Sequence, residues 1–145
     1  MGKGGFFLQE KSDFYTLKGY QIKNNQKITE AMEDYLEMIY RTYQMEKRIR
    51  INDLAASLNV KPSSVSKMVQ KLKELHLVSS HKYGDVYLTK EGLMKGEYLL
   101  WRHNILVSFF TFLNGENYTL EQVEKIEHFI DFTTLKNMEL FLLHK

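Results

Sequence analysis

Six side chains with carboxylate or imidazole donors are spaced along this 145-residue sequence so that helices could bring them together. The first two are three positions apart, so on one helix their carboxylates would lie side by side. The last three have the i, i+3, i+4 spacing by which one helix can offer three ligands to one centre. The six residues are Asp34, Glu37, His103, Glu124, Glu127 and His128.

This donor set indicates a metal site. It contains four carboxylates and two imidazoles, and the chain has no cysteine. Such donors suit a divalent cation with about six ligands, manganese or ferrous iron rather than zinc or copper(I). Four carboxylates held together would repel one another, so we expect two ions per subunit to share them. Each group alone also has a plainer interpretation, in which the acids face water and His103 is an ordinary core residue.

Helical periodicity predicts the elements that would carry these donors. A helix over 28–45, with Thr29 as its N-cap, would carry the first two. A long helix over 90–113 would carry the first histidine, and a helix over 119–132 would carry the last three donors. A final helix, starting at residue 133 or 134, would complete the chain.

The stretch 51–77 predicts a second kind of function, because it reads as two short helices separated by a tight turn. Asn52 would cap the first helix, which would end at Asn59, and Val60 would point inward. Pro62 suits the first turn of the second helix, where its missing N–H would be unpaired anyway. The second helix has an apolar stripe at i, i+3, i+4 and i+7, formed by Val65, Met68, Val69 and Leu72.

The other side of that second helix is basic and hydroxylic, which suits the major groove of DNA. The runs 77–80 and 86–89 flank a glycine-containing turn and predict a β-hairpin, so the whole is a winged helix. Five lysines stand against one acid between residues 61 and 82, which favours a polyanionic partner. The residues expected to contact DNA are Ser63, Ser64, Ser66, Lys67, Gln70, Lys71, Lys82 and Tyr83.

The expected fold class is therefore mainly α with a small β-hairpin wing. An N-terminal extension (1–27) would precede a winged helix-turn-helix domain (28–89) and an all-helical dimerisation and metal-binding domain (90–145). The last domain has more apolar side chains than two or three helices can bury, which predicts a symmetric homodimer. No membrane partner is expected, since no apolar run approaches the roughly 20 residues of a spanning helix. The lack of a signal peptide and of cysteine indicates the cytoplasm.

Four motifs of the chain occur in the order and spacing of a known family: MEDYLEMIY, KPSSVSKMVQKL, the pair Arg102-His103, and VEKIEHF. Through them residues 28–143 resemble the DtxR/MntR family of metal-dependent transcriptional repressors, most closely its manganese-responsive branch. The resemblance implies a homodimer that binds operator DNA with metal as corepressor and controls metal homeostasis genes. It also implies that the family's ligand positions fall on the six donors. Asp34 and Glu124 stand where the iron-sensing branch has softer ligands, and we expect no SH3-like domain.

Two other functions stay open from the residues alone. A winged-helix regulator could sense a small organic ligand in its dimer cleft, and it would then show no metal dependence. A dinuclear metal enzyme could also use carboxylate-rich helices. Such bundles usually pair Glu-x-x-His motifs from two helices, and this chain offers no such pair. An enzyme also gives no reason for the basic recognition helix and wing, so we expect a regulator and not an enzyme.

Overall fold

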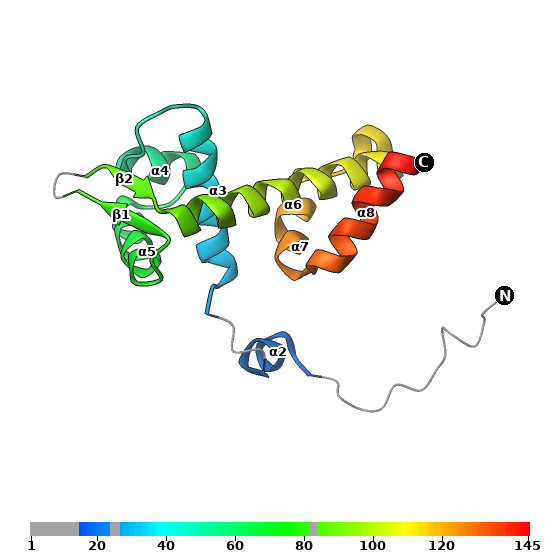
Figure 1. The fold of residues 1–145 in the computed structure, drawn as a ribbon, viewed down its shortest axis with the longest axis horizontal. Coiled ribbons are helices and arrows are strands. Elements are labelled where there is room, and N and C mark those ends of the chain that lie inside the picture. The colour runs from blue at the N-terminus through cyan, green and yellow to red at the C-terminus, as the bar shows by residue number, and fades with distance from the viewer. Residues whose placement is uncertain (1–14, 24–26, 82–83) are drawn as a thin grey trace.

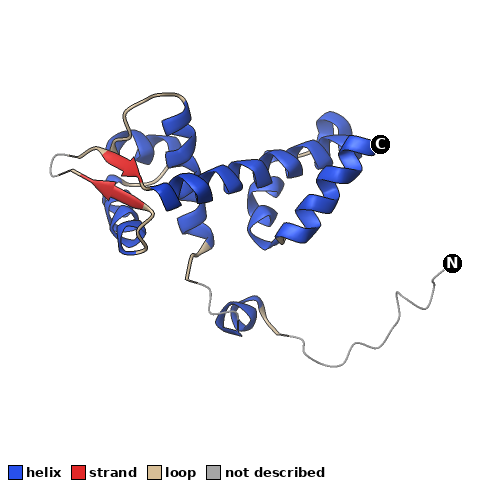
Figure 2. Cartoon of the chain, viewed as in Figure 1, coloured by secondary structure: helices blue, strands red, loops and turns tan. Residues whose placement is uncertain are grey.

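The computed structural model describes residues 15–23, 27–81 and 84–145, and within them one short hairpin accompanies a set of helices (Figures 1 and 2). The predicted DNA contacts Lys82 and Tyr83, and residues 1–14 and 24–26 of the extension, lie outside the described residues. The elements are α2 (Leu17–Lys23), α3 (Glu30–Gln44), α4 (Ile51–Leu58), α5 (Pro62–Glu74), β1 (Val78–Ser80), β2 (Val86–Leu88), α6 (Lys90–Asn114), η1 (Gly115–Asn117), α7 (Leu120–Ile126), η2 (Glu127–Phe129) and α8 (Phe132–His144).

Within the N-terminal extension the structure contains the short helix α2, although the sequence there shows no sustained helical period. Local contacts account for it. The Thr16 hydroxyl accepts a hydrogen bond from the Gly19 N–H at 3.0 Å. The rings of Tyr15 and Tyr20 meet edge to face, with centroids 5.2 Å apart.

The helix-turn-helix forms as predicted, with two differences. α4 ends at Asn59, whose φ of 56° is left-handed, and α5 begins with Pro62 in its first turn. The prediction that Asn52 caps α4 is wrong, because Arg50 precedes the helix and is fixed by a β-bridge to the wing. The prediction that Val60 points inward is also wrong, since its side chain is 38% exposed. The left-handed turn before it directs the chain to the surface.

The hairpin that forms the wing is anchored at its base. β1 and β2 pair antiparallel, with Val78 opposite Leu88. The N–H of Val86 donates to the carbonyl of Ile49 at 2.8 Å, which ties the second strand to the segment before α4. The wing and the helix-turn-helix therefore form one body, and the predicted winged-helix fold is confirmed.

The longest element is α6, whose 25 residues run from the wing to the far end of the molecule (Figure 1). Thr89 caps it by accepting a hydrogen bond from the Gly92 N–H at 3.0 Å. Close approach explains both glycines of its first half. A Cβ at Gly92 would lie 1.9 Å from the carbonyl oxygen of Leu77, and one at Gly96 would lie 2.6 Å from the Cβ of Tyr40. The lack of a side chain at Gly96 therefore lets Tyr40 of α3 pack directly on the backbone of α6.

Two apolar cores lie along α6. The first belongs to the winged helix and includes Leu36, Ile39, Leu54, Val65, Leu72 and Leu99. The second joins α6 to α7 and α8 through Ile105, Leu106, Val123 and Leu135. Because Leu99 lies on α6, the first core reaches past residue 90, and the domain boundaries expected from the sequence stay a prediction.

The helix expected over 119–132 is interrupted. α7 ends at Ile126, and the next three residues form the 3-10 turn η2. The side chain of Asp131 then caps α8 by accepting a hydrogen bond from the Thr134 N–H at 2.8 Å, so this helix begins at Phe132. The break lets α8 turn back along α6, where Leu135 is fully buried.

Large apolar side chains remain exposed near the outer ends of α6 and α8, namely Phe112, Leu113, Leu140, Phe141 and Leu143, and Phe132 is exposed at the start of α8. The rings of Phe112 and Phe141 contact each other with centroids 5.4 Å apart, so this surface is continuous across both helices. The homodimer that would cover it stays a prediction. Among the described residues, no helix is both long enough and apolar enough to span a membrane.

Candidate metal centre

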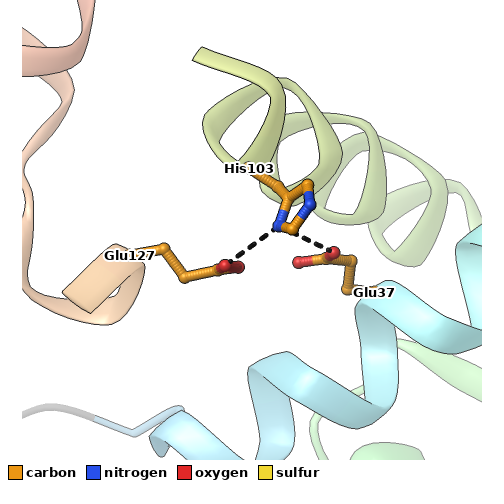
Figure 3. Close-up of side chains that lie close together, drawn as sticks. All are labelled: Glu37, His103 and Glu127. Carbon is orange, nitrogen blue, oxygen red and sulfur yellow. Dashed lines mark hydrogen bonds and ion pairs between the residues drawn. The ribbon is translucent and has the colours of Figure 1, made fainter. Parts of the chain in front are cut away.

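Three of the predicted donors meet where three elements come together (Figure 3). They are Glu37 on α3, His103 on α6 and Glu127 on η2. Nδ1 of His103 lies 3.1 Å from Oε2 of Glu127 and 3.9 Å from Oε2 of Glu37. One donor atom from each residue lies within 4.8 Å of the other two. All three residues are buried, and Glu127 is only 1% exposed.

Apolar neighbours fix the direction of each donor. On α3, Leu36 and Ile39 are fully buried and turn the adjacent Glu37 toward α6. On α6, Leu99 and Leu106 lie one turn before and after His103 and are also fully buried. The chain then turns at η2, directly after the end of α7, and this turn brings Glu127 toward His103. Three separate packing contacts therefore assemble the site.

This first cluster is short of positive charge. Burial raises the pKa of Glu37 to about 7, and repulsion from Glu127 adds to the shift although Arg41 opposes it. Two buried carboxylates share a single imidazole, His103. Oxygen and imidazole donors without sulfur are the ligands that suit manganese or ferrous iron. The residues present therefore fit a divalent cation.

A second polar cluster lies about one helical turn away and joins the same three elements. Oε1 of Glu33 lies 3.2 Å from Nη2 of Arg102, and Oε2 of Glu33 lies 3.6 Å from Nζ of Lys95. His128 places Nδ1 2.8 Å from Glu33 and Nε2 3.0 Å from Asp34. This cluster contains two permanent cations of the protein itself, Arg102 and Lys95, whereas the first cluster has one, the partly exposed Arg41 on Glu37.

The charges of this second cluster are matched internally. Burial lowers the pKa of His128, but hydrogen bonds to Asp34 and Glu33 outweigh it and raise the pKa to about 9. Burial raises the pKa of Glu33, but contacts with His128 and Arg102 hold it below its usual value. The second cluster therefore has less need of an added cation than the first.

The six predicted donors are thus divided. Glu37, His103 and Glu127 form the first cluster, whereas Asp34 and His128 meet in the second. Glu124 is exposed on α7 and joins neither cluster. The helix ends between Glu124 and Glu127, so these residues do not share the helical arc that the sequence suggested. The role of all six as metal ligands stays a prediction.

Four charged residues of these clusters were not predicted as site residues, and one of them is Lys95, which lies 3.6 Å from Glu33. Glu33 and Arg102 anchor the second cluster, and Arg41 donates to Glu37 in the first. One signal was available: Glu33, Glu37 and Arg41 recur at i, i+4 and i+8, which places them in line along one helix. Arg102 was named only as part of the motif Arg102-His103, and its place on an otherwise apolar helix face did not indicate a charged partner.

The surface predicted to contact DNA is open to solvent. The predicted contacts on α5 are all exposed, whereas Val65, Val69 and Leu72 on the opposite side are buried. The first turn of α5 contains no acid, and Lys71 and Lys73 lie in its last turn. This face can therefore approach a polyanion, and its contacts with DNA stay a prediction.

A winged helix beside a buried acid and imidazole cluster defines a class, the metal-responsive DNA-binding regulators. Comparison with known proteins leads to the same class. Residues 27–86 match the family model described as "Iron dependent repressor, N-terminal DNA binding domain". Over 109 residues the chain is 38% identical to the "HTH-type transcriptional regulator MntR" of Oceanobacillus iheyensis, and the match covers 74% of each chain.

Solved structures give the same result. The manganese regulator SloR matches with a TM-score of 0.68 and 30% identity over 79% of this chain. The T. acidophilum IdeR matches with a TM-score of 0.63 and 25% identity over 75% of this chain. This chain spans about half the length of those two, 54% and 53%. It belongs to the MntR/DtxR family of metal-dependent transcriptional regulators, which are repressors and not enzymes.

Proposed function

We propose that this regulator responds to manganese, with ferrous iron as the alternative ion, and that metal binding favours operator binding by a homodimer. The observation that carries the proposal is the buried cluster of Glu37, His103 and Glu127. It draws one donor from each of three elements, and two of its members are carboxylates that repel each other. Relatives named as manganese regulators support the choice of ion.

A divalent cation bound there would supply the positive charge that the cluster lacks. Glu37 belongs to the helix that packs into the winged-helix core, and Glu127 belongs to the turn that leads into α8. Holding both carboxylates at one point would restrict how the winged helix, the reading head of the regulator, is placed relative to the C-terminal helices. A coupling of about 1–3 kcal/mol would be enough to change operator affinity some 5–150-fold.

Two ions per subunit were expected from the sequence, and the two clusters suggest that they would bind unequally. A second ion would draw on Asp34, His128 and the exposed Glu124. The first two of these already bind each other, and His128 also binds Glu33. Those contacts must be given up, so we infer that the second ion binds less tightly than the first.

In this proposal α5 enters the major groove, and the wing lies along the sugar-phosphate backbone, which Lys82 and Tyr83 are expected to contact. Two copies related by a twofold axis would read two half-sites a helical turn or more apart. The exposed aromatic surface on α6 and α8 is the part of the described chain that would form the contact between copies. The cytoplasm is the compartment that fits such a regulator.

Selection from a pool of random duplex DNA tests the function. Binding is carried out with manganese, with ferrous iron and with a chelator, and the retained DNA is sequenced. We expect a palindrome to be enriched only when metal is present, which would also identify the more effective ion. Equal enrichment in chelator would keep the DNA-binding function and remove metal as the corepressor.

Replacing Lys67 with alanine is expected to weaken operator binding about fivefold or more at every metal concentration. Lys67 is exposed on the face of α5 that would meet DNA, and it is not part of the metal cluster. Fluorescence anisotropy over a range of salt concentrations should also show a smaller salt dependence. The matched control is Lys125→Ala, which removes an exposed lysine of α7. Unchanged affinity would remove Lys67 from the interface.

A further inference from the structure

The carboxylate of Glu37 already has a cationic partner within its own helix. Arg41 lies one turn further along α3 and donates from Nε to Oε2 of Glu37 at 3.0 Å. Its Nη2 donates to the same oxygen at 2.5 Å. Both guanidinium contacts therefore converge on a single carboxylate oxygen. Oxygens that accept two charge-assisted hydrogen bonds are strongly held.

That oxygen is also the one that faces the metal cluster. Oε2 of Glu37 is the atom that lies 3.9 Å from Nδ1 of His103 (Figure 3). Glu127, by contrast, contacts the imidazole directly and has no arginine or lysine partner among the ion pairs of the described residues. Within the first cluster, Glu37 is thus the donor that the protein's own cation occupies. A metal ion that binds this oxygen must displace Arg41 or share the carboxylate with it.

The surroundings of Arg41 permit its release. Its side chain is 36% exposed, whereas that of Glu37 is 10% exposed. It borders a surface hollow of about 700 Å³ whose lining includes none of the three residues of the first cluster. Leaving Glu37 therefore requires no rearrangement of the core, and one acid, Asp53, lines the same hollow. The charged residues around this hollow are Arg41, Lys47, Arg48, Arg50 and Asp53.

We propose, resting on the metal site of the proposed function, that Arg41 competes with the metal for Glu37 and so sets the metal concentration at which the regulator responds. In the metal-free protein Arg41 neutralises a buried carboxylate that would otherwise be repelled by Glu127. The same contact lowers metal affinity, because a metal ion that binds Oε2 of Glu37 must displace Arg41 or share the carboxylate with it. The cation of Arg41 would also repel a metal ion nearby.

The test measures metal binding directly, by titrating manganese into the DNA-free protein in the presence of a fluorescent chelator. Arg41→Met keeps most of the aliphatic stem but removes the charge and the hydrogen bonds. We expect it to tighten manganese binding about two- to fivefold. The titration is made without oxygen at about pH 8.5, above the usual range of carboxyl pKa values, so that protons compete little for Glu37.

Arg48→Met is the matched control, because Arg48 lines the same hollow but pairs with Asp85 at 2.9 Å instead of Glu37. Its manganese affinity should stay at the parental value. Thermal unfolding of the metal-free proteins establishes that the variants fold, and Arg41→Gln serves as a second substitution. Unchanged or weaker binding in both Arg41 variants, or an equal gain in Arg48→Met, would overturn the proposal.

A separate variant distinguishes this proposal from the proposed function. Glu37→Gln removes the ligand itself and should weaken manganese binding strongly, whatever Arg41 does. If Glu37→Gln binds manganese like the parent, the metal site is wrong. If Glu37→Gln loses binding but the Arg41 variants match the parent, the site is right and Arg41 does not compete for it.

Discussion

Replacing His103 with alanine is expected to abolish the metal dependence of operator binding. His103 is the only imidazole of the first cluster, and without it two buried carboxylates would have to hold the cation alone. Loss of one donor in three should weaken manganese binding about 100-fold or more, since even residues that only orient a ligand are worth about 10–100-fold. Calorimetric titration of manganese, followed by anisotropy with an operator duplex, measures both effects.

The buried position of His103 makes a structural control necessary, because its side chain is 8% exposed. His103→Gln fills a similar volume and separates the loss of a ligand from the loss of packing. His144→Ala removes an exposed histidine at the end of α8 and should leave metal binding as it is. An operator affinity that still rises with manganese in both His103 variants would exclude this residue as a ligand.

Replacing Arg102 with methionine is expected to destabilise the metal-free protein by about 3 kcal/mol. The Arg102 side chain is buried, and its Nη2 contacts Glu33 at 3.2 Å. Its Nε has no hydrogen-bond partner in the described structure. The contribution of Arg102 to stability therefore comes from its charge and from the contact of its Nη2. Removing it would leave the Glu33 carboxylate in a site with less positive charge. Urea unfolding at one fixed protein concentration measures the loss.

A double variant tests the cause of that destabilisation. If the cost comes from leaving Glu33 uncompensated, adding Glu33→Gln to Arg102→Met should recover part of the lost free energy. The control Lys136→Met removes an exposed lysine that pairs with Glu139 and should change stability by about 0.5 kcal/mol or less. A cost below about 1 kcal/mol for Arg102→Met would mean that the second cluster does not depend on this cation.

The elements that local sequence determines were predicted well. Thr29 and Thr89 cap α3 and α6 as expected, because capping depends on a few adjacent residues. The turn at Asn59 and the hairpin around Gly84 also follow from local backbone preferences, with φ of 56° and 107°. The winged helix is built from elements whose ends depend on adjacent residues. The amino-acid sequence therefore indicated its fold class correctly.

Features that depend on contacts between distant residues were predicted less completely. Asp34 and Glu33 are neighbours on α3, yet the structure buries Glu33 and leaves the Asp34 side chain 52% exposed. The direction in which α3 crosses α6 determines which of the two acids is buried, and the periodicity within α3 does not predict that direction. The break after Ile126 is similar, because apolar spacing continues across it while packing of α8 requires the turn.

The crossing of α3 and α6 at Gly96 makes α6 a rigid arm on a pivot. From Gly96 to Asn114 the unbroken helix extends about 27 Å, whereas His103 lies only about 10 Å from the pivot. A rotation of about 5° at the crossing would move His103 by about 0.9 Å and the far end by more than 2 Å. A movement of His103 that is small enough to keep it close to a bound ion is therefore accompanied by a larger movement at the aromatic end of α6. The spacing of two reading heads joined through those ends would be correspondingly sensitive to what the cluster holds.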